Sequence, residues 1–126
     1  ITMSVPQDLL YSKDHEWVKI EGDSATIGIT DYAQESMGDI VFVNLPAEGD
    51  SFAAEDTLCD IESVKAVSDI LCPVGGTVTE VNEELMDAPE KINQDAYGAW
   101  LVKVSGVEGA DALMSAAEYE EFLKEA

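Results

Sequence analysis

The sequence predicts a mainly β fold, a sandwich or barrel with short flanking helices. Three observations support this fold class. Short apolar runs of strand type dominate the chain. Some of them alternate apolar with polar or small residues, which is the two-residue period of a strand. Turn-forming residues separate the runs at roughly the spacing of an all-β sandwich or barrel.

The first predicted element is a hairpin of residues 17–20 and 25–29, joined by a turn at 21–23. Apolar residues alternate with smaller or polar ones in its second strand, which indicates one buried face.

A short helix is predicted over residues 31–37, with Thr30 or Asp31 as its N-cap and Gly38 as its stop. Residues 40–45 form a nearly continuous apolar run that a proline closes. This run predicts a buried strand.

A second hairpin is predicted for residues 57–62 and 67–72. In an antiparallel hairpin the residue numbers of each directly opposed pair have a constant sum. If this sum is odd, as when Cys59 lies opposite Ile70 or Cys72, one face of the hairpin is apolar and the other is acidic. One face then holds Cys59, Ile61, Ile70 and Cys72, and the other holds Asp60, Glu62 and Asp69. A slip of one residue would mix these sets, so the sorting predicts the register. It places both cysteines inward on neighbouring strands, and Lys65 at the tip.

Two further strands are predicted at 77–81 and 100–104, with a turn of helix after Asn82 in the loop between them. Ser115 and Glu118 form a capping box that starts a C-terminal helix. Its apolar stripe, expected to pack on the sheet, consists of Tyr119, Phe122 and Leu123.

The length of 126 residues and the apolar fraction of 46 % suit one domain, expected over residues 3–126. Ile1 and Thr2 precede Met3 and are interpreted as a remnant of cloning. A processed natural start at Ile1 is the alternative. No apolar run has the length of a membrane span, and no signal or transit segment is evident. These features favour the bacterial cytoplasm, although a mature organellar protein would look the same.

Charge is the most unusual bulk property of the chain. Six lysines and 27 acidic residues give a formal net charge of −21, and arginine is absent. Such a chain would be repelled by nucleic acids and by anionic membranes. The acidity serves either solubility or docking onto basic surfaces of partner proteins.

The chain contains two cysteines, one histidine and no CxxC motif. This composition argues against a zinc site, and no metal site is predicted. Nothing near either cysteine supports nucleophilic catalysis. Both are expected to be buried and reduced.

Lys65 stands between Val64 and Ala66 at the tip of the second hairpin. Its neighbours are small and uncharged, which would give an enzyme access to its amine for covalent attachment. The alternative is a solvated turn lysine in an unmodified acidic binding module.

Several motifs, in order, resemble the H protein family of the glycine cleavage system. The similarity covers about residues 10–123, and Ala96 departs from the family's usual proline. The motifs are His15-Glu16-Trp17-Val18, residues 25–30, residues 38–46, Glu62-Ser63-Val64-Lys65-Ala66, Ser68-Asp69-Ile70, Pro73, Gly76, Val81-Asn82, Tyr97-Gly98 and Trp100.

The resemblance implies a barrel-sandwich hybrid and attachment of lipoic acid to the Lys65 amine. Glu62, Ser63, Val64 and Ala66 would then form the attachment motif. It also implies a carrier rather than an enzyme, with no catalytic residues, because the chemistry resides in the cofactor.

The implied partners act on the arm in turn. Glycine decarboxylase loads an aminomethyl group, aminomethyltransferase removes it, and dihydrolipoyl dehydrogenase reoxidises the arm. A lipoyl or octanoyl transferase or ligase attaches it. The carrier is expected to be a monomer.

A loaded arm would end in a cationic amine, which a carboxylate would favour. Glu16 and Asp69 match family positions near the loaded arm, and Asp14, two residues before Glu16, is expected to lie close. His15 is interpreted as a structural hydrogen-bonding residue at a strand start.

Other carriers remain alternatives: a lipoyl relay protein resembling the H proteins, a lipoyl domain of a 2-oxoacid dehydrogenase, or a biotinyl carrier. Biotinyl carriers usually place methionines beside the lysine, where this chain has Val64 and Ala66.

Overall fold

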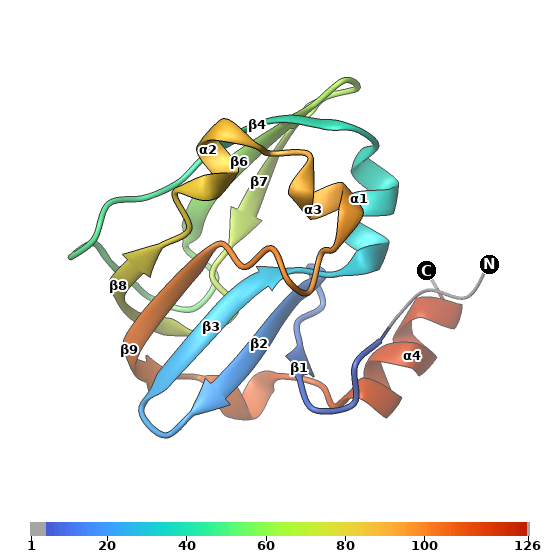
Figure 1. The fold of residues 1–126 in the computed structure, drawn as a ribbon. Coiled ribbons are helices and arrows are strands. Elements are labelled where there is room, and N and C mark those ends of the chain that lie inside the picture. The colour runs from blue at the N-terminus through green and yellow to red at the C-terminus, as the bar shows by residue number, and fades with distance from the viewer. Residues whose placement is uncertain (1–4, 126) are drawn as a thin grey trace.

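The computed structural model describes residues 5–125 as two antiparallel sheets with short helices (Figure 1). The larger sheet has the strand order β1-β2-β3-β9-β8-β5, and the smaller has the order β4-β6-β7. This arrangement confirms the predicted mainly β fold. The expectation for Ile1, Thr2 and Met3 lies outside the described residues.

The strands are β1 (Leu10–Tyr11), β2 (Glu16–Glu21), β3 (Ser24–Ile29), β4 (Ile40–Asn44), β5 (Ser51–Phe52), β6 (Thr57–Ser63), β7 (Val67–Leu71), β8 (Gly75–Val81) and β9 (Val102–Glu108). The helices are α1 (Asp31–Met37), α2 (Glu84–Asp87), α3 (Lys91–Gln94), the 3-10 turn η1 (Ala110–Ala112) and α4 (Ala116–Lys124). Strands β1 and β5 and helices α3 and η1 were not predicted. They are short, so they carry too few residues to show a period.

The β2–β3 hairpin follows the predicted pattern, and Trp17 lies directly opposite Gly28. A Cβ atom at Gly28 would stand 2.5 Å from the indole ring, so only glycine lets the ring lie flat on β3. The Trp17 Nε1–H group donates a hydrogen bond to the Ala96 carbonyl, at 3.1 Å. The indole therefore ties β2 to the loop after α3.

Helix α1 has the predicted bounds. The Thr30 hydroxyl accepts a hydrogen bond from the Ala33 backbone N–H, which makes Thr30 the N-cap. Gly38 ends the helix with φ of +80°, a conformation that other residues rarely adopt.

The β6–β7 hairpin has the predicted odd register over most of its length. Cys59 pairs with Ile70, and Glu62 pairs with Val67. A bulge between Thr57 and Cys59 shifts the pairing toward the base of the hairpin. Both cysteines are buried and form no disulfide, as predicted.

Strand β4 corrects the prediction of a buried run. Ile40 and Val43 are buried, but Val41 is 53 % exposed and Phe42 is 42 % exposed. The pairing of β4 with β6 is irregular between Ile40 and Phe42. This bulge places two successive side chains on the outer side of the sheet, a shift that no periodic pattern reveals.

The C-terminal helix α4 begins with the predicted capping box and packs beside β1 (Figure 1). Its Tyr119 ring stacks on Tyr11, with ring centroids 4.6 Å apart. Together with neighbouring side chains they form a second apolar cluster, separate from the main core between the sheets. The buried members of this second cluster are Leu9, Tyr11, Trp17, Ala116 and Tyr119.

Candidate functional site

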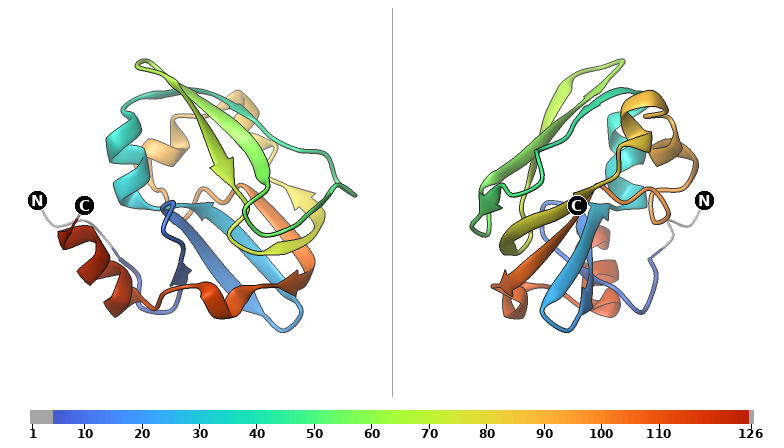
Figure 2. Two further views of the ribbon diagram at one scale, coloured as in Figure 1. Left: turned by 180° about the vertical axis from the view of Figure 1, so that it is seen from behind. Right: turned by 60° about the vertical axis from the view of Figure 1, so that its left-hand side comes forward.

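The β6–β7 hairpin extends beyond the rest of the molecule, with its turn at the top of Figure 1 and of both views in Figure 2. Lys65 occupies this turn and is exposed, as the sequence predicted. The β6–β7 pairing holds the turn on two strands, so the backbone of the lysine is fixed by the ladder.

The Ser63 hydroxyl closes the turn. Its oxygen accepts hydrogen bonds from the backbone N–H groups of Lys65 and Ala66, both at 3.2 Å. The Ser63 backbone N–H donates to the Ala66 carbonyl at 2.9 Å. Serine thus replaces the Asn-Gly or Asp-Gly that usually forms such turns. Sequence reasoning included Ser63 in the motif without assigning this role, although its side chain lies two residues before Lys65.

The tip is also joined to the end of α1. The Val64 backbone N–H donates to the Asp39 carbonyl at 3.0 Å. The Lys65 side chain lies over Gly38, where an added Cβ would stand 3.2 Å from the lysine Cε. Gly38 was predicted only as a helix stop, and its contact with Lys65 is visible only in three dimensions.

The lysine side chain lines a groove of about 320 Å³ between α1 and the hairpin. The groove walls are small or apolar on the α1 side and small on the hairpin side. They comprise Ala33, Ser36, Met37, Ser63, Ala66 and Ser68. An acyl chain attached to Lys65 could lie here without burying a charged group.

Glu16 is buried at the start of β2, with 1 % of its surface exposed. Its Oε1 accepts a hydrogen bond from the Ser12 hydroxyl at 2.6 Å, and the Leu71 backbone also bonds to its carboxyl group. Burial is the main cause that raises the pKa of Glu16 to about 7, and the nearby Asp14 charge adds to it. The structure therefore holds a titratable carboxyl group near the base of the hairpin.

Asp69 is exposed on β7, opposite Asp60. The charges of Asp69 and Glu16 both contribute to raising the pKa of Cys59, so the two acids lie in one region. Asp14 is exposed and lines a cavity of about 220 Å³ with Cys72. The three predicted acids therefore lie around the base of the hairpin, whereas Lys65 is at its tip.

A long acyl chain on the Lys65 amine would span the distance from the hairpin turn to Asp69 near the base of the hairpin. Asp69 lies four positions after Lys65 along the chain, which corresponds to about 13 Å at the usual rise of extended backbone. An extended lysine side chain with an octanoyl-length acyl group has a reach of this order.

His15 lies just before β2 and has φ of +68°. Its Nδ1 atom and the Tyr119 hydroxyl are 2.7 Å apart, and that hydroxyl also bonds with the Thr30 hydroxyl at 2.8 Å. Burial lowers the pKa of His15. These contacts confirm the structural interpretation of His15, because they tie α4 to the start of α1.

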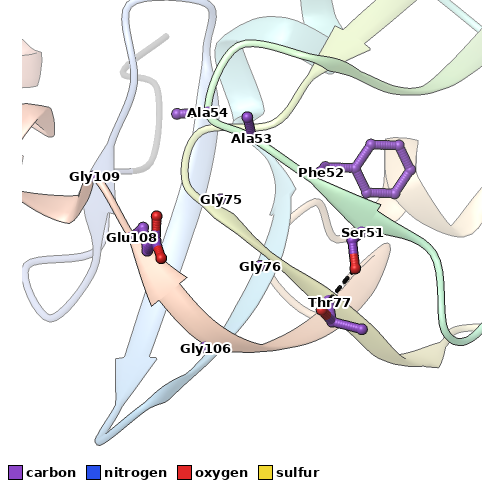
Figure 3. Close-up of a pocket in the computed structure, with 10 residues that line it drawn as sticks. All are labelled: Ser51, Phe52, Ala53, Ala54, Gly75, Gly76, Thr77, Gly106, Glu108 and Gly109. Carbon is purple, nitrogen blue, oxygen red and sulfur yellow. Dashed lines mark hydrogen bonds between the residues drawn. The ribbon is translucent and has the colours of Figure 1, made fainter.

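A wider groove, of about 540 Å³, lies where β5, β8 and the end of β9 meet (Figure 3). Figure 3 shows the Ser51 and Thr77 hydroxyls hydrogen-bonded across it, at 2.8 Å. Glu108 is the one ionisable side chain in its lining. The two hydroxyls bond to each other, and the lining of the groove does not include Lys65.

Residues 5–125 contain neither a candidate metal site nor a helix that could span a membrane. They show no group of three or more His, Cys, Asp or Glu side chains placed to hold a metal ion. Within the same residues, every helix is too short or too polar to cross a membrane.

Comparison with known proteins gives consistent matches over nearly the whole chain. The family model described as the glycine cleavage H-protein matches residues 9–126. The glycine cleavage system H protein of Lachnoclostridium phytofermentans is 52 % identical over 123 residues, which cover 97 % of each chain. The one from Rubrobacter xylanophilus is 55 % identical over 122 residues, which cover 96 % of each chain.

The fold also matches a solved structure. The crystal structure of a glycine cleavage system H protein from Mycobacterium marinum superposes with a TM-score of 0.88. It is 38 % identical in sequence, and the match covers 95 % of this chain and 99 % of that one.

Proposed function

The chain belongs to the glycine cleavage H-protein family, and from this premise we propose that Lys65 is its lipoyl attachment site. Members of this family are carriers that bear lipoic acid on a lysine and shuttle the aminomethyl group of glycine. The chain is accordingly a component of the glycine cleavage system and not a catalyst.

The position of Lys65 at the exposed turn of a firm hairpin is the observation that carries this proposal. Three of the other five lysines, Lys91, Lys103 and Lys124, form ion pairs with glutamates. Lys13 and Lys19 are exposed as well. Lys13 lies in the turn that joins β1 to β2 and lines a cavity of about 220 Å³, and Lys19 lies on β2 itself. Of these three lysines, Lys65 lies at the turn of the β6–β7 hairpin, which extends beyond the rest of the molecule (Figure 1).

The residues around Lys65 fit the group. The amine of Lys65 would form the amide bond, and the small side chains of Ala33 and Ala66 leave room for the acyl chain. When bound, the lipoyl group supplies the dithiolane that takes up the aminomethyl group. The groove lined by Met37 and Ser68 would limit the access of water to the arm.

The acids at the base of the hairpin supply negative charge for a cationic amine. We assign this role first to Glu16, because its carboxyl group is buried where an ion pair is screened least. Asp69 and Asp14 are exposed and would add a weaker, screened attraction. Glu62, the first residue of the proposed attachment motif, is half-buried on β6.

The partners follow from membership in the system. We infer that the carrier meets glycine decarboxylase, aminomethyltransferase and dihydrolipoyl dehydrogenase, and that a lipoyl or octanoyl transferase or ligase attaches the arm. We further infer that residues 3–126 act as a single monomeric carrier domain. The relatives from Lachnoclostridium phytofermentans and Rubrobacter xylanophilus are bacterial, which supports a bacterial cytoplasmic location.

Replacement of Lys65 by arginine tests the attachment site. Arginine keeps the charge but is a poor acyl acceptor, so lipoylation should vanish while the free energy of unfolding changes by only about 0.5 kcal/mol. Peptide mass spectrometry over residues 60–71, after co-expression with a lipoate ligase, measures the modification. The matched controls Lys13→Arg and Lys19→Arg should remain lipoylated. A lipoylated Lys65→Arg chain would refute the assignment.

A further inference from the structure

Most of the exposed large apolar side chains lie on β4 and the β6–β7 hairpin, beside the Lys65 turn. Within residues 5–125 they comprise Ile20, Val41, Phe42, Val64, Val67 and Met86. Four of these, Val41, Phe42, Val64 and Val67, belong to β4 and the β6–β7 hairpin, and we call them the tip patch. Their exposed fractions run from 42 % for Phe42 to 67 % for Val64.

The backbone pairing places members of the tip patch on one face. Glu62 on β6 pairs with Phe42 on one side and with Val67 on the other. Directly opposed residues point to the same side of a sheet, so Phe42 and Val67 flank Glu62 on the outer face of the smaller sheet. Val64 is held near them, because its N–H group donates to the carbonyl of Asp39, the residue just before β4.

The bulge in β4 enlarges the tip patch. In a regular strand Val41 and Phe42 would point to opposite faces, and one of them would be buried. The irregular pairing between Ile40 and Phe42 leaves both exposed. Two large apolar side chains in water carry a free-energy penalty that a partner could remove by covering them.

The border of the tip patch is acidic. Glu62 lies between Phe42 and Val67, and the next row on the same face contains Asp60 and Asp69. Strands β4, β6 and β7 carry no lysine or arginine, and Lys65 is the only cation in the turn that joins β6 to β7. A partner that covers the tip patch would therefore bring lysine or arginine side chains to these acids.

The lysine side chain leaves this face free. It lies over Gly38 and lines the groove with Ser63 and Ser68. Ser68 pairs with buried Ile61, so this groove lies on the inner side of the hairpin. A partner on the outer side can therefore bind without displacing an arm that rests in the groove.

We propose that the tip patch is the docking surface for the enzyme that loads the arm, the glycine decarboxylase, through an apolar surface bordered by basic residues. The proposal rests on Lys65 as the attachment site. An unloaded arm has no cation to draw it toward Glu16, so it rests near the tip, next to the tip patch. The decarboxylase and the dehydrogenase both meet an arm without a cation, and of the two we assign the tip patch to the decarboxylase. An equal effect of Phe42→Thr on turnover by the dehydrogenase would overturn that assignment.

A competition experiment separates docking from the arm. A Lys65→Ala chain cannot carry lipoate but keeps the tip patch. It should inhibit decarboxylase turnover on the fully lipoylated wild-type carrier, in competition with it. A Phe42→Thr change in this competitor keeps a strand-forming residue and removes the ring. It should raise the inhibition constant about tenfold, the usual size of a hot-spot effect.

Ile20→Thr in the same Lys65→Ala background is the matched control. Ile20 lies in the β2–β3 hairpin and is 37 % exposed, and its replacement should leave the inhibition constant unchanged. Thermal unfolding of each competitor confirms that it is folded. Val67→Thr, which is close in shape to valine, should weaken inhibition in the same direction as Phe42→Thr.

Each outcome has a defined meaning. Equal inhibition by the Phe42→Thr and Ile20→Thr competitors would overturn the docking surface. Sedimentation that shows a dimer broken by Phe42→Thr would assign the tip patch to a second copy of the chain and would also overturn it. Turnover by the Lys65→Ala chain itself would refute the attachment site instead, which distinguishes the two proposals.

Discussion

Replacement of Glu16 by glutamine should change how stability depends on pH. The folded chain holds this buried carboxyl group at a pKa of about 7, against an ordinary value of 4.5. Between these two values the unfolded chain has released the proton and the folded chain still binds it. Stability therefore falls as pH rises from about 4.5 to about 7, and the whole penalty is present above that range.

The size of the penalty follows from the two pKa values. Linkage gives about 0.8 kcal/mol at about pH 5 and about 3.3 kcal/mol at about pH 8. Glutamine has no charge to bury, so the Glu16→Gln chain escapes this penalty at both pH values. Relative to the wild type, it should gain about 2.5 kcal/mol between them.

The hydrogen bonds of Glu16 do not enter this difference. Glutamine can accept from Ser12 or from the Leu71 backbone with its carbonyl oxygen, but its amide then faces the other donor. That conflict destabilises the variant equally at both pH values, and other carboxylates titrate alike in both chains. The difference between the two pH values therefore isolates the proton on Glu16.

Urea unfolding of both chains at the two pH values measures the effect. Both conditions lie above the sequence pI of about 4.1, where the net negative charge keeps the chain soluble. Parallel pH profiles for wild type and variant would refute the reasoning, because they would mean that Glu16 titrates near its ordinary value in the folded chain.

Two further predictions concern the hairpin and its surroundings. Gly38→Ala should destabilise the fold by about 1–3 kcal/mol, because φ of +80° is strained for alanine. It should also shift the NMR signals of Lys65, whose Cε would lie 3.2 Å from the new Cβ. Unchanged signals would argue against that contact. Burial raises the pKa of Cys59 and of Cys72 to about 12, so a thiol reagent near neutral pH should modify neither until the chain is unfolded. Rapid modification of the folded chain, seen by intact mass, would show that a sulfur reaches solvent.

The sequence by itself determined the hairpin and its register. Cys59 and Ile70 lie inside, and Asp60 and Asp69 lie outside, because a two-residue period leaves a single way to sort them. It also determined helix α1, since Thr30 and Gly38 are local signals that act on the backbone beside them. The motif around Lys65 likewise needed no coordinates.

Only the tertiary structure decided what surrounds the lysine. The contact between Lys65 and Gly38 joins residues that are distant in sequence, and the Ser63 turn depends on hydrogen bonds rather than on a turn dipeptide. The pKa of Glu16 depends on burial that no local pattern records.

The bulge in β4 shows the limit most clearly. The apolar run at residues 40–45 predicted a buried strand, yet Val41 and Phe42 are exposed. Hydrophobicity favours burial, but one irregular pair in the ladder with β6 decides which side chains reach the core. That choice is made by strand pairing across the sheet, so the exposed patch beside Lys65 became visible only when the strands were placed together.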